Sequence, residues 1–166
     1  MSVQGKITAS INLTEGSAVD FGSAIRQILA SFSLTLDNGT GDNQADLVFA
    51  DQRTLAASAT ENLDLAGALA QTFGATLTMA KLKAMYFKAA DGNTNNVIIG
   101  NVTNGIVGPF GAATHSILVP PGGVFLWAGP KTGQTITAGT QDLIKVANSG
   151  GGTGVTYDVV LLGTSV

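Results

Sequence analysis

His115 is the only histidine of the chain, so it is the first side chain to test for catalysis. Serine-hydrolase chemistry needs a histidine base that a carboxylate orients and a nucleophile held in a sharp turn. His115 stands between Thr114 and Ser116 at an expected strand start, and no Gly-x-Ser-x-Gly elbow occurs. With one histidine and no cysteine, a zinc site also lacks ligands. The sequence therefore predicts a non-enzymatic protein in which His115 is an ordinary surface or interface residue.

The glycine-rich run Gly150–Gly154 superficially resembles a phosphate-binding loop. Such a loop binds phosphate because it opens a helix whose N-terminus faces the anion. Here a β-branched and aromatic run, Val155–Val159, follows instead. The run is therefore interpreted as a flexible connector between strands, and no cofactor is expected.

The segment Asp37–Asn43 offers carboxylate and amide oxygens of the kind that Ca²⁺ prefers. Its spacing does not match an EF-hand, and no bidentate glutamate follows at the required distance. An Asx-type turn explains the same residues without a metal. The sequence alone leaves calcium binding by the loop from Asp37 to Asp42 open.

The remaining carboxylates are scattered, mostly in expected turns, and the sequence alone does not place two of them at the separation that glycoside hydrolysis needs. Trp127 lies between Leu126 and Ala128 in an expected strand, which favours a core or interface position over a sugar-stacking platform. No catalytic, cofactor-binding or metal-binding residue is assigned.

The composition points to association with other protein surfaces. Only 11% of the 166 residues are charged, against about 25% in an average soluble protein, and the net charge is −3. Few ions would have to be desolvated if such a surface were buried against another copy. The eight lysines and arginines form no basic stripe, so nucleic acid is not an expected partner. The longest apolar runs are too short to span a bilayer, and no signal peptide is visible at the N-terminus.

Short alternating runs separated by turn residues predict eight to ten strands in one domain, residues 1–166. Lys6–Leu13 places Ile7, Ala9, Ile11 and Leu13 on one face, and residues 1–13 are expected to form an N-terminal arm or a first strand. Thr76–Ala89 fits strand and helix spacing, and the strand is preferred because β runs surround it. Short helices are expected at Ser23–Leu29 and at Leu65–Phe73. The fold class is therefore all-β, a sandwich or barrel with one or two short helices.

Several runs from about Asp46 onward resemble small virion proteins of tailed bacteriophages, in particular head decoration (capsid cement) proteins. The runs are Asp51–Gly67, Asn95–Gly100, Pro121–Gly123, Leu143–Gly150 and Val155–Gly163. The resemblance implies a jelly-roll or related β fold, a homo-oligomer that is commonly a trimer, and attachment over capsomer junctions. It brings no catalytic residues.

The resulting hypothesis is a capsid decoration protein that binds the outside of a phage head and stabilises it. Its partners would be the major capsid protein and further copies of itself, with neither nucleic acid nor membrane involved. It would assemble in the host bacterial cytoplasm and reside on the virion surface. Three alternatives stay open, namely a phage tail or fibre component, a carbohydrate-binding module, and an enzyme acting on cell walls.

Overall fold

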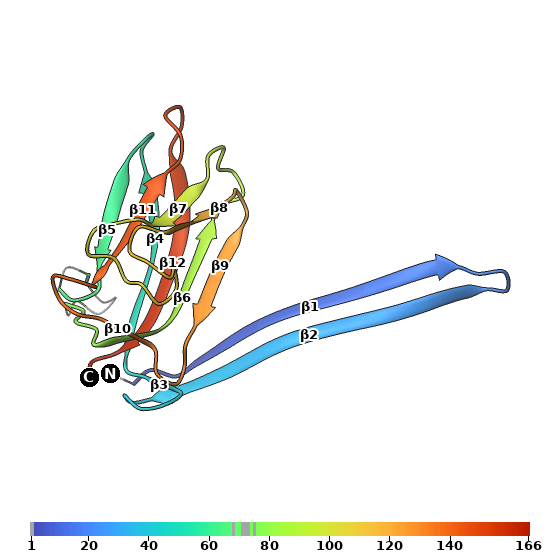
Figure 1. Ribbon diagram of the computed structural model, residues 1–166, viewed down its shortest axis with the longest axis horizontal. Coiled ribbons are helices and arrows are strands. Elements are labelled where there is room, and N and C mark those ends of the chain that lie inside the picture. The colour runs from blue at the N-terminus through green and yellow to red at the C-terminus, as the bar shows by residue number, and fades with distance from the viewer. Residues whose placement is uncertain (1, 68, 71–73, 75) are drawn as a thin grey trace.

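The computed structural model describes residues 2–67, 69, 70, 74 and 76–166. Within these ranges the chain is all-β, with twelve strands and no helix. It divides into a sandwich-like body and a long two-stranded hairpin that projects from one end of the body (Figure 1). We call this hairpin the arm; it consists of β1 (Gly5–Ala18) and β2 (Ser23–Asn38).

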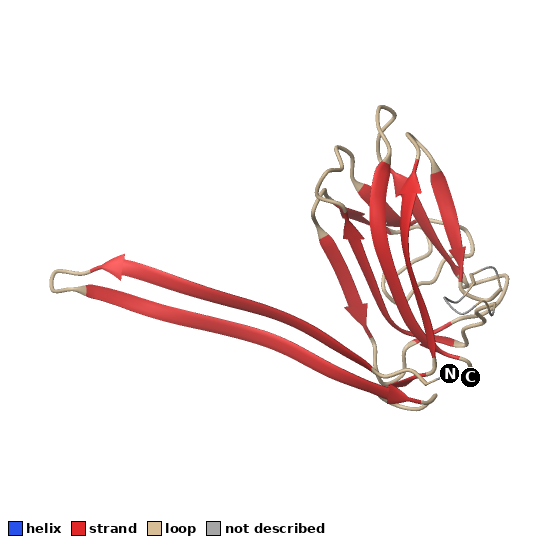
Figure 2. Ribbon diagram, turned by 180° about the vertical axis from the view of Figure 1, so that it is seen from behind, coloured by secondary structure: helices blue, strands red, loops and turns tan. Residues whose placement is uncertain are grey.

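The body has two antiparallel sheets that pack face to face (Figure 2). The first sheet has the order β10-β6-β12-β4, and β9 also pairs with β6. Its strands are β4 (Leu47–Leu55), β6 (Lys81–Ala89), β9 (Val124–Ala128), β10 (Gln134–Thr135) and β12 (Val155–Thr164). The second sheet has the order β5-β11-β7-β8, with strands β5 (Thr60–Asp64), β7 (Val97–Gly100), β8 (Ser116–Val119) and β11 (Leu143–Asn148).

The strand pairs are nested along the chain. β4 pairs with β12, β5 with β11, β6 with β9, and β7 with β8. Successive pairs alternate between the two sheets. The body is therefore one long antiparallel hairpin folded over on itself. In sequence, β7 and β8 form the pair that is closest together and β4 and β12 the pair that is farthest apart.

Strict alternation along the strands fills the space between the sheets. In β12, Val155, Tyr157, Val159 and Leu161 are buried, while the residues between them are half-exposed. Phe87, Leu63 and Ile144, from three other strands, are completely buried in the same cluster. Because side chains of a strand point alternately to its two faces, this pattern leaves the other side of the first sheet free to face outward.

The structure corrects several sequence predictions. Ser23–Leu29, expected as a short helix, is the first half of β2, because pairing with β1 outweighs its helical spacing. For Leu65–Phe73, residues 68 and 71–73 lie outside the described residues, and Leu65–Gly67 forms a turn. The described strands number twelve instead of eight to ten. The all-β class and the strand assignment of Lys81–Ala89 within Thr76–Ala89 are confirmed.

Candidate functional site: the arm and the groove at its root

The arm is the feature that distinguishes this chain from a plain sandwich. β1 and β2 pair over the whole length of β1, from Gly5 opposite Leu36 to Ala18 opposite Ser23. At about 3.4 Å per residue, the 14 residues of β1 extend about 45 Å. The tip reverses at Val19–Gly22, where Gly22 has a φ of +98° that a residue with a side chain rarely adopts. The sequence prediction of residues 1–13 as an arm or first strand captured only part of one strand of this hairpin.

The arm is amphipathic along its inner two-thirds. Four cross-strand pairs present one apolar face, and on the opposite face most positions are Ser, Thr, Asn or Gln. The apolar face consists of Ile7, Ala9, Ile11, Leu13, Ile28, Ala30, Phe32 and Leu34. We call this set the arm face. It ends toward the tip at the pair Glu15 and Arg26, whose exposed side chains lie 3.9 Å apart.

Much of the arm's apolar surface is open to solvent. Ile11 is 60% exposed, Leu13 54% and Phe32 45%, and Phe21 at the tip is 100% exposed. An isolated two-stranded hairpin is at best marginally stable in water, and three or more strands or a packing partner are normally needed. A solvated arm with such a face therefore has the composition of a surface that another protein covers.

The root of the arm is firmly attached to the body. Leu36 is completely buried with Val3 and Ala45, and Val48 and Leu162 of the first sheet pack against them. The backbone N–H of Val3 donates to Asn38 Oδ1 at 2.9 Å. The short β3 (Gln44–Ala45) runs parallel to the end of β2. These contacts fix the direction in which the arm leaves the body.

Lys83 anchors the same region from inside the body. A register shift between Leu162 and Gly163 leaves Lys83 as a bulge residue in β6, and its side chain is 1% exposed. Its Nζ donates to three backbone carbonyls, those of Gly41 at 3.1 Å, Pro130 at 3.2 Å and Lys131 at 2.5 Å. Burial lowers the pKa of Lys83, and the charge of Lys81 lowers it further, while Asp42 opposes both.

Replacing Lys83 should destabilise the protein strongly. In the Lys83→Met variant three carbonyl oxygens at the arm root lose their donor, which should reduce the free energy of unfolding by about 2–4 kcal/mol. Urea unfolding monitored by circular dichroism measures this loss. Lys145→Met, in the half-exposed outward row of β11, is the matched control and should change the value by less than about 0.5 kcal/mol. Equal stability of the two variants would contradict the anchoring role.

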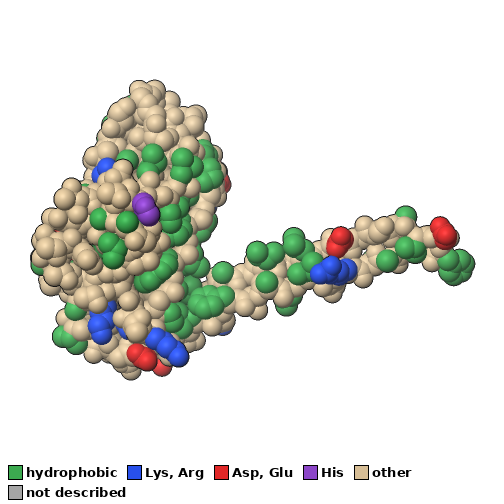
Figure 3. Space-filling view, viewed as in Figure 1, with side chains coloured by type: hydrophobic (Ala, Val, Ile, Leu, Met, Phe, Trp, Pro, Cys, Tyr) green, Lys and Arg blue, Asp and Glu red, His purple; other side chains and the backbone are tan. Residues whose placement is uncertain are grey.

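A groove lies in the angle between the arm root and the outer side of the first sheet. It has a volume of about 490 Å³. One wall is β1 from Lys6 to Ala9, and the floor is made by outward side chains of β6, β9 and β12. These are Ala84, Tyr86, Val124, Leu126, Val160 and Leu162. Figure 3 shows hydrophobic side chains gathered along this edge of the body and continuing onto the arm.

The groove is bounded by charge. In the register of the sheet, Leu126, Tyr86 and Val160 form one outward row across β9, β6 and β12. In the next row Lys88 lies opposite Asp158, followed on β4 by Gln52. Outer faces of antiparallel sheets are usually polar when they face water. Here the outer face of the first sheet is polar only in the part that is distant from the arm. The apolar part lies next to the arm root and forms one continuous surface with it.

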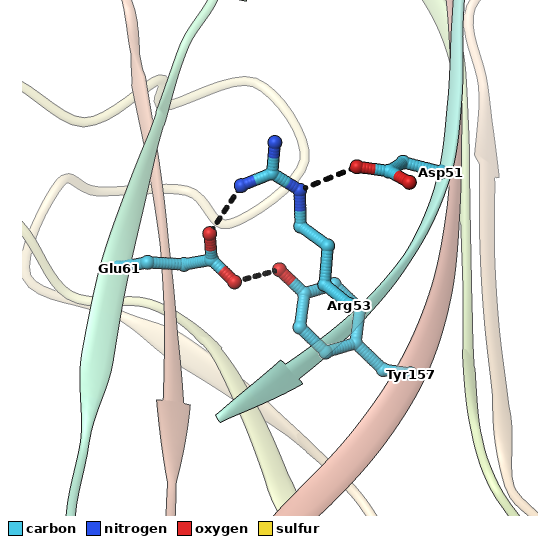
Figure 4. A network of polar contacts seen from close by, with 4 residues as sticks. All are labelled: Asp51, Arg53, Glu61 and Tyr157. Atoms are coloured by element: carbon cyan, nitrogen blue, oxygen red, sulfur yellow. Dashed lines mark hydrogen bonds and ion pairs between the residues drawn. The ribbon is translucent and has the colours of Figure 1, made fainter. Parts of the chain in front are cut away.

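A polar network of four residues lies at the opposite side of the body, between β4 and β5 (Figure 4). The Tyr157 hydroxyl donates to Glu61 Oε1 at 2.7 Å, and Arg53 pairs with Glu61 and with Asp51. Burial raises the pKa of Tyr157, and its hydrogen bond to Glu61 raises it further. Tyr157 is completely buried and both oxygens of Glu61 are engaged, so the network ties an edge of one sheet to an edge of the other.

The Tyr157→Phe variant should lose about 1 kcal/mol of stability at neutral pH, since Glu61 loses one donor. The folded state keeps the Tyr157 proton at a pH where an unfolded tyrosine, with a pKa of about 10, releases it. The stabilisation is therefore fully present below pH 10 and decreases as the pH rises above it. Urea unfolding of both proteins at about pH 8 and about pH 11 should show a smaller difference at the higher pH. A difference that grows with pH would contradict the assignment.

The other residues considered from the sequence lie apart from one another. His115 Nδ1 is 3.0 Å from the carbonyl oxygen of Phe110, an exposed contact with no carboxylate in it. Trp127 is half-buried against the core. The loop Gly150–Gly154 connects β11 with β12. The side chain of Asn148, at the end of β11, accepts from Gly150 N–H and donates to the Thr153 carbonyl of this loop.

The loop from Asp37 to Asn43 is the turn that joins β2 to β3. Asp37 N–H donates to the carbonyl of Asn43, and Gly41 N–H donates to Gln44 Oε1. Throughout the described ranges, no group of three or more His, Cys, Asp or Glu side chains is arranged to hold a metal ion. Nor does any described helix reach the length and apolarity needed to cross a membrane.

Comparison with protein-family models, with curated proteins and with solved structures gave no match for this chain. The functional interpretation therefore rests on the arm and the groove.

Proposed function

We propose that this chain is a structural protein of a larger assembly, and that it attaches through its arm. The observation that carries this proposal is the arm face, an apolar strip on a hairpin that, among the described residues, has no packing partner along most of its length. A folded monomer would gain nothing from a solvated strip of this kind, whereas an assembly buries it.

The edges of the arm support the same function. β2 pairs with β3 only at Asp37 and Asn38, so the outer edges of both arm strands carry unpaired N–H and C=O groups. Long apolar edges promote aggregation unless something blunts or covers them. The arm strands contain no proline, and their only charged residues are Lys6, Glu15, Arg26 and Asp37. Coverage by a neighbouring subunit is the remaining way to protect these edges.

In specific terms, we propose a jelly-roll decoration protein of a phage head, bound outside at capsomer junctions as a homo-oligomer, with a trimer expected. The nesting of the strand pairs, which alternate between a five-stranded and a four-stranded sheet, supports the jelly-roll part of this proposal, and jelly rolls are used in viral capsid domains. Fold alone does not determine function, so the resemblance of the sequence runs to phage decoration proteins and the arm together support this choice. Repeated weak contacts would stabilise a shell by binding its assembled state.

Co-sedimentation with empty, expanded capsids of the phage that encodes the chain tests this proposal. We expect saturable binding at a copy number that matches the shell symmetry, and a decorated shell that resists heating better than a bare one. Absence of binding to heads, or binding to isolated tails or to glycans instead, would overturn the decoration function.

A further inference from the structure

Two apolar surfaces of this chain meet at the arm root and remain uncovered beyond it. The arm face continues from Ile7 and Leu34, which pack in the root cluster, outward to Leu13 and Ile28. The groove floor continues from Leu162 of the same cluster to Val124, which is 54% exposed. The body and the arm thus form the two sides of an angle with an apolar inner surface (Figure 3).

The arm cannot cover its own groove. Of the arm, only Lys6–Ala9 lines the groove, and the strands then extend away from the body (Figures 1 and 2). The root contacts of Leu36 and Asn38 hold this direction, and Lys83 secures the turn that follows β2. An arm that arrives from another molecule meets no such constraint.

The two surfaces match in shape and in their charged limits. The arm face is one side of a two-stranded sheet and the groove floor is one side of a larger sheet, and apolar sheet sides of this kind stack in a sandwich. The arm face ends at Glu15 and Arg26, and the groove ends at Lys88 and Asp158. Each border carries one positive and one negative charge, so an arm laid across the groove can place opposite charges together.

The area is sufficient for a stable contact. The chain exposes 8743 Å². A compact protein of 16.7 kDa is expected to expose roughly 7,600 Å², which is about 1,100 Å² less. Stable interfaces bury about 800 Å² or more from each partner. The surplus that the arm creates is therefore as large as the area one partner contributes to a specific complex.

We propose that the groove at the arm root is the docking site for the arm of a second copy of this chain. The arm face of one molecule covers the outer side of the first sheet of its neighbour, and this exchange closes the homo-oligomer. The inference rests on the proposed structural function and names the contact by which copies join. It differs from arm-to-arm packing, in which the groove would stay empty.

Light scattering coupled to size-exclusion chromatography tests the exchange on five full-length proteins, namely the unmodified chain, two variants and two controls. One variant carries Ile11→Thr, Leu13→Thr and Phe32→Thr on the arm face. The other carries Leu126→Lys and Val160→Lys in the groove. The matched controls are Ser10→Thr, Asn12→Thr and Ser33→Thr on the polar face of the arm, and Thr54→Lys with Thr60→Lys at exposed positions outside the groove. Circular dichroism confirms that each protein is folded.

We expect the unmodified chain and both controls to have a mass at least twice 16.7 kDa at up to about 0.1 mM. Each variant alone should dissociate, with a dissociation constant raised about 100-fold or more. A mixture of the two variants should associate again, because it joins one intact arm with one intact groove.

Three results would overturn the exchange. If the unmodified chain is monomeric, the exchange is wrong. If that monomer nevertheless binds shells, the proposed structural function is retained. A groove variant that associates as well as the unmodified chain would show that arms pack on arms. Folded variants that do not associate when mixed would exclude the arm-to-groove contact.

Discussion

Removing the arm is expected to abolish both self-association and shell binding while the body stays folded. Residues 7–34 can be replaced by Asn-Gly, because Lys6 and Thr35 are directly paired and a two-residue type I′ turn connects such a pair. The deletion removes the whole arm face and leaves the buried Leu36 and Val3 in place. We expect binding to fall at least about 100-fold, since the apolar anchors of an interface carry most of its energy.

Sedimentation with and without shells measures this effect, and thermal unfolding provides the control. The armless chain should unfold within a few degrees of the full chain, since the sandwich core lies outside the deleted residues. An armless chain that binds shells as well as the full chain would contradict the proposed attachment through the arm.

Truncating Phe87 is expected to cause the largest loss of stability. Phe87 is completely buried, and its ring stacks on that of Tyr157 at a centroid distance of 6.1 Å, at the centre of the first sheet. Phe87→Ala removes this contact and leaves a cavity between the sheets, which should cost about 3–5 kcal/mol. A typical domain has only about 5–15 kcal/mol of stability, so the variant should unfold at much lower urea concentration.

Phe21→Ala provides the matched control, because the substitution is the same and the site is fully exposed at the tip of the arm. It should leave the free energy of unfolding unchanged within about 0.5 kcal/mol. If Phe21→Ala destabilised the monomer as much as Phe87→Ala, the separation of the chain into a stabilising core and a binding arm would be wrong.

Local patterns predicted part of this molecule well. The alternation in Lys6–Leu13 assigned Ile11 and Leu13 to the correct face, because strand periodicity depends only on neighbouring residues. The turn at Asp37–Asn43 was predicted for the same reason, since Asp, Asn and Gly favour turns locally.

Other parts depend on contacts between distant residues. Ile25 and Leu29 fit a helix by spacing, yet they lie in β2 opposite Gly16 and Asn12, a pairing that local sequence does not reveal. The groove brings together β6, β9 and β12, which are far apart in the sequence. Lys83 reaches its three carbonyls only because a bulge redirects it. The signal that could have identified the whole arm is a pair of long alternating runs, one on each side of Asp20-Phe21-Gly22.

A difference map from electron cryomicroscopy of capsids with and without the added protein tests most directly whether this chain decorates a phage head. We expect extra density of sandwich shape on the outer surface at symmetry-related positions, with each arm lying on a neighbouring copy. Capsids that show no added density, or density confined to the tail, would contradict the proposed decoration of the head.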